Sequence, residues 1–552
     1  MTTKTLSRRD FLRYLALGSA GLLTSGSLAS LLSSCTPQGD GAIALATAGL
    51  PATALPITET PTLSVESASG IEPDVEIALR AFPAQVPIFP GSSTKVWQYQ
   101  GEMLKGAPEV LQDLPNTYLG PAFHMKKGQT VRVHFTNELP EVSIVHWHGL
   151  HVPELADGHP RFVIDTGETY VYDFQVSNRA GTYWYHPHPH GRTGPQAYYG
   201  LAGLFIMSDE EEGALGLPEG EFDIPLVIQD RLFNNDNQLV YGSNGMMDQM
   251  MGFLGDRILV NGQPDFTLPV ATRPYRLRLL NGSNSRIYKL TWDDGTPLTV
   301  IGTDGGLLER PVQREYVTLA PSQRVELWVD FSLHPLDSEV RLASLPFSGG
   351  ESMEGGMMAG SGMPQGARFT VLTVKVNQET KSSASLPKRL TSFSSYDVAQ
   401  AVNRRSPRKF VLAMTMRQGW SINGRTFEMT DVAPDEVVKL NTLETWQFIN
   451  QGGGMGMGRG MMGGMELPHP MHVHNLQFQV VERQVQSAYR DAWETLSAGH
   501  IDEGWRDTVM VMPGEQVKIL LKFEDYTGLY LYHCHNLEHE DMGMMRNYRV
   551  EA

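Results

Sequence analysis

Cysteine is scarce in this chain, whose 552 residues include only two, Cys35 and Cys534. So few thiols exclude the disulfide framework that stabilises many small secreted domains. Cys35 lies in the N-terminal segment, which leaves Cys534 as the one thiol of the main body. Long apolar runs are scarce as well. The run that ends at Leu32 is interrupted by Gly and Ser, so a permanent transmembrane helix is not expected.

Positive charge is in deficit. Lys and Arg number 44 against 61 Asp and Glu, which gives a formal net charge of −17. Because an acidic surface repels nucleic-acid phosphates, we expect no nucleic-acid partner. The same surface attracts cations. Acidity that merely keeps an exported protein in solution is an alternative that the sequence leaves open.

The first 35 residues are typical of an export signal. Residues 7–13, with Arg8 and Arg9, match a twin-arginine signal, which carries folded proteins. Two cleavage sites compete: residues 27–29 suit a signal peptidase, whereas residues 32–35 suit a lipobox that leaves Cys35 acylated. We favour the lipobox, with residues 36–71 as a flexible tether. The protein is then expected in the periplasm or otherwise outside the cytoplasmic membrane, with a lipid anchor at Cys35.

Turn-forming residues punctuate the sequence, with 55 Gly and 34 Pro. The strings between them are short and rich in Val, Thr and Tyr, as in residues 129–135 and 169–174. No long helical period competes with this pattern. The sequence therefore predicts an all-β protein of sandwiches or barrels, and its length predicts two to four domains.

Histidine supplies the most informative pattern of the chain. Ten of the 17 histidines fall in four short segments. They are His146-Trp147-His148, His186-Pro187-His188, His469-Pro470-Met471-His472-Val473-His474, and His533-Cys534-His535 with His539. A single His-x-His pair on a strand is more often structural. Four such segments in one chain indicate metal binding.

The triplet around Cys534 has a geometric consequence. Successive side chains of a strand point to opposite faces, so His533 and His535 project one way and Cys534 the other. A thiolate on one face can bind one metal while the two imidazoles bind others, with only backbone between them. Cys and His with a weak axial Met, here Met544, are the ligands of blue-copper electron-transfer sites.

In these four segments, taken in order, the chain resembles the multicopper oxidases. The resemblance runs from about residue 72 to the C-terminus and is greatest to bacterial periplasmic copper-efflux oxidases and bacterial laccases. It extends to the strings at residues 185–191, 200–204 and 537–541, and to Gly543-Met544-Met545. These motifs are specific, because their spacing fixes the ligand roles as well as the residue types.

The resemblance implies four copper ions: one type 1, one type 2 and a type 3 pair. The implied type 1 ligands are Cys534, His469, His539 and the axial Met544. The implied type 2 ligands are His146 and His472. The implied type 3 ligands are His148, His186, His188, His474, His533 and His535. No ligand position of the family pattern is vacant.

The resemblance also implies three cupredoxin-like Greek-key domains. We expect domain 1 at residues 72–208, a copper-free domain 2 at 222–378, a linker at 379–406 and domain 3 at 407–552. The trinuclear cluster takes four histidines from domain 1 and four from domain 3. It must therefore lie at the interface of these two domains, with domain 2 as a spacer.

The implied reaction couples four one-electron oxidations of a donor to the reduction of O2 to water. Electrons would pass through Cys534 to His533 and His535, and Asp157 and Glu540 occupy the positions of the family's proton carriers. The fold does not select the donor. We expect Cu(I) first, with a role in copper tolerance, then phenols and aromatic amines, then Fe(II) or Mn(II), and we expect a monomer. The alternatives are a general laccase and a copper-buffering protein without turnover.

Methionine is concentrated in three Gly-rich loops, which hold 13 of the 26. The loops contain Met246, Met247, Met250 and Met251; Met353, Met357, Met358 and Met363; and Met455, Met457, Met461, Met462 and Met465. Thioethers are soft ligands suited to Cu(I), and the third loop ends just before His469. We expect the methionines of that loop to bind Cu(I) as substrate. A loop that holds methionine without a function is the alternative.

The lipobox interpretation predicts the mass of the mature N-terminal peptide. If Cys35 is the mature N-terminus, mass spectrometry of the N-terminal peptide should find Cys35 carrying acyl chains, and the protein should fractionate with membranes. A mature chain that begins at Ser30 without lipid would contradict this interpretation and favour the signal peptidase site.

Overall fold

The computed structural model describes residues 72–349, 362–380, 382, 384–393, 395–415, 419–451 and 466–552. The predictions for the export segment 1–35, the lipid at Cys35 and the tether 36–71 lie outside these residues. So do those for Met353, Met357 and Met358, and for the expected Cu(I) ligands Met455, Met457, Met461, Met462 and Met465.

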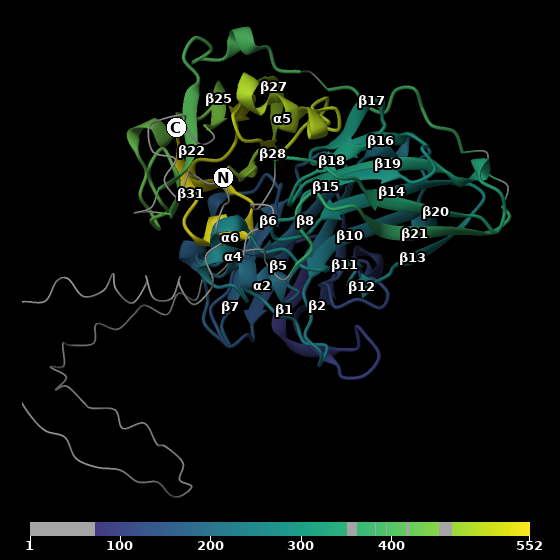
Figure 1. The fold of residues 1–552 in the computed structure, drawn as a ribbon. Coiled ribbons are helices and arrows are strands. Elements are labelled where there is room, and N and C mark those ends of the chain that lie inside the picture. Colours follow the sequence, from purple (N-terminus) through teal and green to yellow (C-terminus); the bar gives the residue numbers. More distant parts are fainter. Residues whose placement is uncertain are drawn as a thin grey trace, which may run out of the picture. The chain divides into compact units, whose positions relative to one another are not determined.

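The described residues form six β-sheets in three pairs (Figure 1). Strands at residues 75–208 form the first pair, those at 223–378 the second and those at 408–551 the third. The expected all-β architecture of three parts is confirmed. In the part of the chain that the structure describes, no helix has the length and apolar character needed to cross a membrane.

The first pair packs a sheet of order β2-β1-β5-β7 on a sheet of order β3-β4-β9-β8-β6. Its strands are β1 (Val75–Val86), β2 (Thr94–Lys105), β3 (Leu111–Gln112), β4 (Ala122–Lys126), β5 (Thr130–Asn137), β6 (Val145–His148), β7 (Thr169–Gln175), β8 (Gly181–Pro187) and β9 (Gly203–Ser208). Along β5 buried and half-buried residues alternate, so Val131, Val133 and Phe135 face the core.

The second pair has the orders β12-β11-β10-β14-β19-β16-β17 and β13-β21-β20-β15-β18. Its strands are β10 (Asp223–Arg231), β11 (Arg257–Val260), β12 (Gln263–Pro264), β13 (Thr267–Ala271), β14 (Pro274–Asn281), β15 (Tyr288–Trp292), β16 (Leu298–Thr303), β17 (Gly306–Arg314), β18 (Val317–Leu319), β19 (Arg324–Asp330), β20 (Glu339–Ser344) and β21 (Phe369–Gln378).

The third pair has the orders β23-β22-β25-β29-β27 and β24-β31-β30-β26-β28. Its strands are β22 (Arg408–Thr415), β23 (Gly419–Ile422), β24 (Val437–Lys439), β25 (Thr442–Asn450), β26 (His469–Val473), β27 (Phe478–Val485), β28 (Thr508–Val511), β29 (Glu515–Phe523), β30 (Gly528–Cys534) and β31 (Met545–Glu551).

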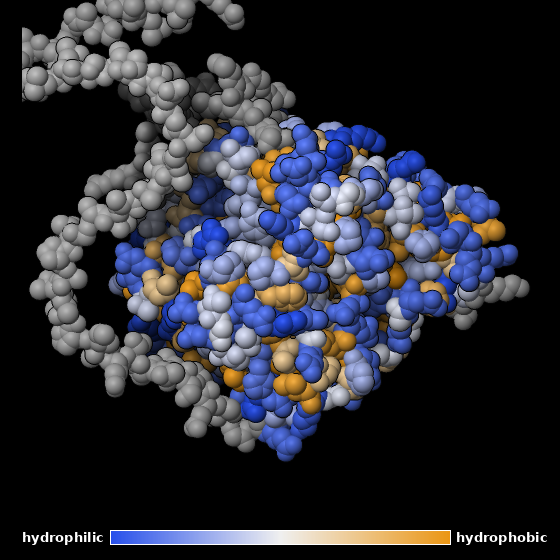
Figure 2. Space-filling view, turned by 90° about the horizontal axis from the view of Figure 1, so that it is seen from below, coloured by the Kyte–Doolittle hydropathy of each residue, from blue (hydrophilic) through white to orange (hydrophobic). Residues whose placement is uncertain are grey.

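Helices are short and lie in the connections. The α-helices are α2 (Thr193–Tyr198), α3 (Glu210–Gly213), α4 (Met246–Met251), α5 (Arg490–Ser497) and α6 (Leu537–Asp541). Single 3₁₀ turns lie at Pro108–Val110, Glu154–Ala156, Pro160–Phe162, Gly220–Phe222, Phe331–Leu333, Val398–Gln400, Pro434–Glu436 and Ser487–Tyr489. On the face shown in Figure 2 hydrophilic residues predominate, with apolar residues interspersed among them.

The central strand β14 is buried on both faces, although it carries two arginines. Leu277 and Leu279 pack in the core of the second pair. On the other face Arg276 and Arg278 pair with the buried carboxylate of Glu326, and Arg278 also reaches Asp223 at 2.7 Å. Each buried cation therefore has a carboxylate partner, as burial of charge requires.

Arg324, at the start of β19, joins all three sheet pairs. Its guanidinium donates to the backbone oxygens of Thr182 at 3.0 Å and Asp304 at 3.1 Å, and to Oδ1 of Asp507 at 2.9 Å. Thr182 belongs to the first pair, Asp304 to the second and Asp507 precedes β28 of the third. The side chains of Arg324 and Asp507 are fully buried.

Replacement of Arg324 should therefore destabilise the whole assembly. Arg324→Met leaves the buried carboxylate of Asp507 without its cation, which should lower the free energy of unfolding by about 3–5 kcal/mol. Urea unfolding of the copper-free protein measures this loss. The matched control is Arg310→Met, at an exposed position of β17. An equal effect of the two substitutions would contradict the role given to Arg324.

Candidate metal centre

Strand pairing brings the His-x-His segments together. In the first sheet pair, β6 lies antiparallel to β8 and His146 is directly opposite His186. In the third, β26 lies antiparallel to β30 and His472 is directly opposite His533. The ring of His146 stacks on that of His474 at 3.7 Å, and the ring of His148 on that of His472 at 3.7 Å. Histidines of the first sheet pair thus lie against histidines of the third.

His146 and His472, the expected type 2 ligands, face each other with 3.4 Å between their Nε2 atoms. The Nδ1 of His146 lies 2.6 Å from the backbone oxygen of Asp157, and the Nδ1 of His472 lies 2.8 Å from that of Asp507. A carbonyl can only accept, so each Nδ1 carries the proton and each Nε2 keeps its lone pair for a metal.

A second group contains His148, His186 and His535, whose ring nitrogens converge within 4.8 Å. His148 and His186 each have one nitrogen at an oxygen: Nε2 of His148 is 3.1 Å from Asp507 Oδ1, and Nδ1 of His186 is 2.8 Å from the backbone oxygen of Pro187. The other nitrogens, Nδ1 of His148 and Nε2 of His186, have no hydrogen-bond partner among the described residues, and neither nitrogen of His535 has one. Buried polar atoms without a partner are rare, and a metal would satisfy them.

A third group contains His188, His474 and His533. The Nε2 of His533 lies 3.1 Å from that of His474 and 3.4 Å from that of His188. The Nδ1 of His533 lies 3.2 Å from the backbone oxygen of Cys534, and the Nδ1 of His474 lies 2.8 Å from Asp157 Oδ2, so each Nδ1 carries the proton. The facing Nε2 atoms of these two rings then both present lone pairs, and a shared cation explains their approach better than a hydrogen bond does. All eight histidines assigned to the trinuclear cluster therefore lie in one buried cluster.

The remaining ligands form a separate group on the other face of β30. The Sγ of Cys534 lies 3.4 Å from Nδ1 of His469 and 3.7 Å from Nδ1 of His539, and the two Nδ1 atoms are 3.3 Å apart. Met544 is fully buried in the core cluster that contains Cys534. The backbone oxygen of Met544 accepts from the N–H of Cys534 at 3.0 Å. The predicted alternation of Cys534 and its histidine neighbours is present.

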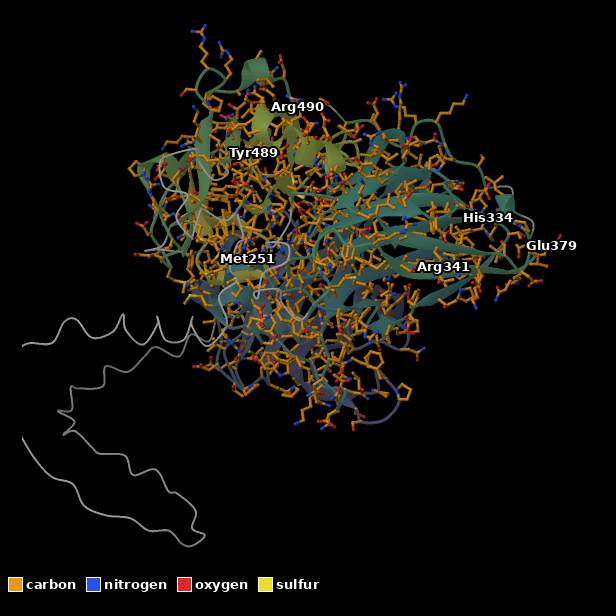
Figure 3. The ribbon with its side chains drawn as sticks, in the orientation of Figure 1. Met251, His334, Arg341, Glu379, Tyr489 and Arg490 are labelled. Atoms are coloured by element: carbon orange, nitrogen blue, oxygen red, sulfur yellow. The ribbon has the colours of Figure 1, made fainter. Side chains whose placement is uncertain are left out.

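The outer nitrogen of His539 is covered. Its Nε2 lies 3.1 Å from the backbone oxygen of Met250 in α4, and the indole N–H of Trp420 donates to the same oxygen at 3.0 Å. The Trp420 ring lies 4.3 Å from the His539 ring and 4.8 Å from the His469 ring. Met251, labelled in Figure 3, packs against the core cluster of Cys534 and Met544. Sequence reasoning missed Trp420 and the position of α4.

Burial sets the charge of these side chains. It lowers the pKa of His469 to about 3 and that of His186 to about 4, and it lowers the pKa of His146 well below its ordinary value. These imidazoles are neutral at neutral pH, which is the form that binds metal. Burial raises the pKa of the Cys534 thiol, so a metal is needed to hold the thiolate.

Comparison with known proteins identifies the family. Two models described as multicopper oxidase match residues 95–212 and 401–552. The multicopper oxidase mco of Staphylococcus aureus is 32% identical over 432 residues, 78% of this chain and 82% of the relative. The laccase of Bacillus subtilis (strain 168) is 31% identical over 491 residues, 83% of this chain and 88% of the relative. The chain belongs to the multicopper oxidases.

A solved structure agrees with this assignment. The McoA multicopper oxidase of the hyperthermophile Aquifex aeolicus is similar to this chain at a TM-score of 0.71 and 34% identity, over 87% of this chain and 97% of that one. The three sheet pairs are therefore the cupredoxin-like domains of a multicopper oxidase, and copper is the implied metal. The buried, unpartnered nitrogens and the single buried thiol described above fit copper.

Two buried carboxylates face the histidine cluster of this multicopper oxidase. The Oδ2 of Asp157 lies 2.8 Å from Nδ1 of His474, and Oε2 of Glu540 lies 3.1 Å from Nδ1 of His533. Burial raises the pKa of Asp157 well above its ordinary value. Burial acts the same way on Glu540, but His533 and His188 outweigh it and hold the pKa of Glu540 below its ordinary value. The two groups thus differ in their readiness to hold a proton.

Asp507 is a third carboxylate at the cluster, and sequence reasoning missed it. It contacts His148 through Oδ1 at 3.1 Å and His472 through its backbone oxygen at 2.8 Å, while its side chain pairs with Arg324. Asp507 is 35 residues from His472 in the sequence. The pairing of β28 with β26 brings it to the histidine cluster. A lone Asp before a strand gives no sequence signal, so only the fold reveals it.

Cys534→Ser should remove the visible colour. The thiolate is the one soft anionic ligand in the described part of the chain, and a serine hydroxyl does not replace it. We expect the copper-loaded protein to be blue, and the variant to lack the intense visible absorption of a copper–thiolate bond and to lose turnover. Absorption spectra and copper content of both proteins test this. A blue Cys534→Ser protein would exclude Cys534 as the type 1 ligand.

Proposed function

We propose that this multicopper oxidase binds four copper ions and uses Cu(I) as its preferred donor. In this proposal type 1 copper is held by His469, Cys534 and His539 with Met544 as axial ligand. Type 2 copper is held by His146 and His472, and the type 3 pair by His148, His186, His188, His474, His533 and His535. The observation that carries the proposal is the convergence of buried ligand atoms in two separate groups, together with the unpartnered ring nitrogens of the histidine cluster.

Bound copper supplies one-electron acceptance at the first group and four-electron reduction of O2 to water at the second. Cys534 is bonded through the backbone to His533 and His535, so a continuous covalent path joins the two groups. The burial of the histidine cluster excludes bulk water. Separation of the groups matters because donors give electrons singly, whereas O2 needs four.

Asp157 and Glu540 are proposed as proton carriers. Each carboxylate touches an imidazole of the cluster and is itself buried, so neither is an ordinary surface group. Asp157 Oδ1 has no hydrogen-bond partner among the described residues, and neither has Glu540 Oε1, whereas Glu540 Oε2 lies 3.1 Å from Nδ1 of His533. A buried carboxylate oxygen that is not engaged in a hydrogen bond is suited to accept and deliver protons.

Removal of these proton carriers should slow one half of the reaction. In Asp157→Asn and Glu540→Gln, re-oxidation by O2 should slow by about 10²–10⁴-fold, the usual contribution of acid–base catalysis. Reduction of the blue centre by the donor should keep its rate, because neither carboxylate is hydrogen-bonded to the side chain of Cys534, His469 or His539. Stopped-flow recording of the loss and return of the blue colour separates the two halves. Equal slowing of both would indicate a structural role.

The preference for Cu(I) rests on methionine near the electron-accepting group. Within the described residues, α4 carries Met246, Met247, Met250 and Met251, and it contacts α6, which contains His539. Met246 is 70% exposed, whereas Met251 packs on the core cluster of Cys534. A run of thioethers from solvent toward the type 1 group suits the passage of a soft cation. A role in copper tolerance follows from this donor.

Oxidation of phenols is the second candidate, because relatives of this chain are named laccase. O2 uptake by the copper-loaded protein, with Cu(I), Fe(II) and a phenol offered separately, decides between the two. If none of the three supports O2 uptake, the oxidase proposal is excluded and copper buffering becomes the better hypothesis.

A variant sharpens the choice of donor. Replacement of the four α4 methionines by leucine keeps their apolar volume and removes their sulfur. Oxidation of Cu(I) should fall by about tenfold or more, since thioethers bind Cu(I) and alkyl groups do not. Oxidation of the phenol should change little. If the two activities fall together, α4 is not a Cu(I) site.

A further inference from the structure

The segment 241–253, here named the cover segment, is fastened at both ends by one side chain. The hydroxyl of Tyr241 donates to Oε1 of Glu538 at 2.9 Å, and the backbone N–H of Phe253 donates to Oε2 at 3.0 Å. The rings of Tyr241 and Phe253 are 5.1 Å apart, so the two ends lie side by side. Helix α4 runs between them, next to α6 (Figure 1). The Glu538 carboxylate thus closes the segment into a loop.

The cover segment lies on His539, the candidate ligand that follows Glu538 in the chain. Met250, inside the cover segment, accepts through its backbone oxygen from His539 and from Trp420. His539 is 0% exposed, so no donor of the size of a phenol touches its ring while the segment is in place. Glu538, which fastens the cover segment, and His539, which the segment covers, are therefore neighbours in α6.

The residue that follows α4 has a backbone conformation and a close packing that favour glycine. Gly252 has a φ of +88°, a conformation that residues with a Cβ rarely adopt. A Cβ there would lie 2.5 Å from Asn536 Nδ2 and 2.5 Å from Ser285 Oγ. Asn536 caps α6 by accepting from the N–H of His539, and Ser285 donates to Glu538. The turn that closes the segment thus packs directly on the groups that hold α6.

We propose that Glu538 is a positioning residue that holds the cover segment over His539 and thereby decides which donors reach it. The proposal rests on the proposed function, because it deepens the donor preference of the same site. With the segment fastened, the site serves Cu(I) bound by the methionines of α4, and aromatic donors are held back from His539. With the segment released, the His539 ring becomes accessible to aromatic donors.

A carboxylate is required at this position. Each oxygen of Glu538 faces one group that can only donate: the amide Nδ2 of Asn284 lies 2.8 Å from Oε1, and the backbone N of Phe253 lies 3.0 Å from Oε2. In Glu538→Gln the new NH2 group must face one of these two N–H donors, whichever way the amide is turned. Glutamine therefore keeps the shape of glutamate and loses at least one of the contacts that hold the segment and its surroundings, which makes it the informative substitution.

Hydrogen–deuterium exchange tests the fastening without reference to catalysis. In copper-free and in copper-loaded Glu538→Gln protein, amides of residues 242–252 should exchange about tenfold faster or more than in the wild type, because local opening costs less free energy. Tyr241→Phe removes one donor from the segment itself and should produce a smaller increase. The matched control is Glu436→Gln, which disturbs a buried carboxylate bonded to Arg546 and Tyr532, away from the segment. Unchanged exchange of 242–252 in Glu538→Gln would overturn the proposal.

Steady-state kinetics test the consequence. For 2,6-dimethoxyphenol the KM of Glu538→Gln should fall by about fivefold or more. For hexacyanoferrate(II), which transfers an electron without entering a pocket, KM should change less than about twofold. The control Glu436→Gln should leave the ratio of the two KM values unchanged. Faster exchange without a change in this ratio would overturn the gating role of Glu538. If the wild type oxidises no donor at all, the proposed function fails, whereas the exchange experiment still decides the fastening.

Discussion

One buried ion pair, Arg324 with Asp507, links the three domains to the metal site. The guanidinium belongs to the second domain and bonds to a backbone oxygen of the first, while its carboxylate partner belongs to the third. Asp507 in turn contacts His148 of the first domain and orients His472 of the third. The second domain thereby takes part in positioning two histidines of the cluster, which the first and third domains supply. Because both charges are fully buried, the pair tolerates little displacement, and the interface of the first and third domains is held in register.

The five residues of helix α6 contact the cover segment, the histidine cluster and the first domain. Glu538 bonds to the cover segment, Glu540 faces the trinuclear histidines, and Asp541 accepts from the backbone N–H groups of Thr193 and Gly194 in the first domain at 2.9 Å and 2.8 Å. Between them lies His539, a ligand of the other group. Three carboxylates in one short helix thus point to three different partners. A buried carboxylate needs several donors, so each of them also fixes the neighbour that supplies those donors.

Much of this site could be predicted from sequence because its ligands come in short segments. A His-x-His pair on a strand places both imidazoles on one face, and Cys534 between His533 and His535 necessarily faces the other way. The all-β fold followed from short Val- and Thr-rich strings such as that of β5, which does alternate in burial. The acidic composition and the methionine content carried less information, because many folds accommodate them. Residues that contact these histidines from outside the segments gave no such signal: Asp507 and Trp420 each stand alone in the sequence.

The sequence by itself determined the ligand types, their grouping into two kinds of site and the family, because covalent neighbours on a strand have a fixed relation to each other. Only the tertiary structure decided which other residues contact the ligands of each group. It placed Asp507 beside His148, a contact between residues 359 positions apart, and it laid the backbone oxygen of Met250 on His539, 289 positions away. Such contacts depend on how whole domains pack, and a backbone oxygen has no residue identity that a sequence could display. Local spacing in the sequence therefore predicts the candidate metal ligands, whereas long-range packing determines how far they are exposed to donors.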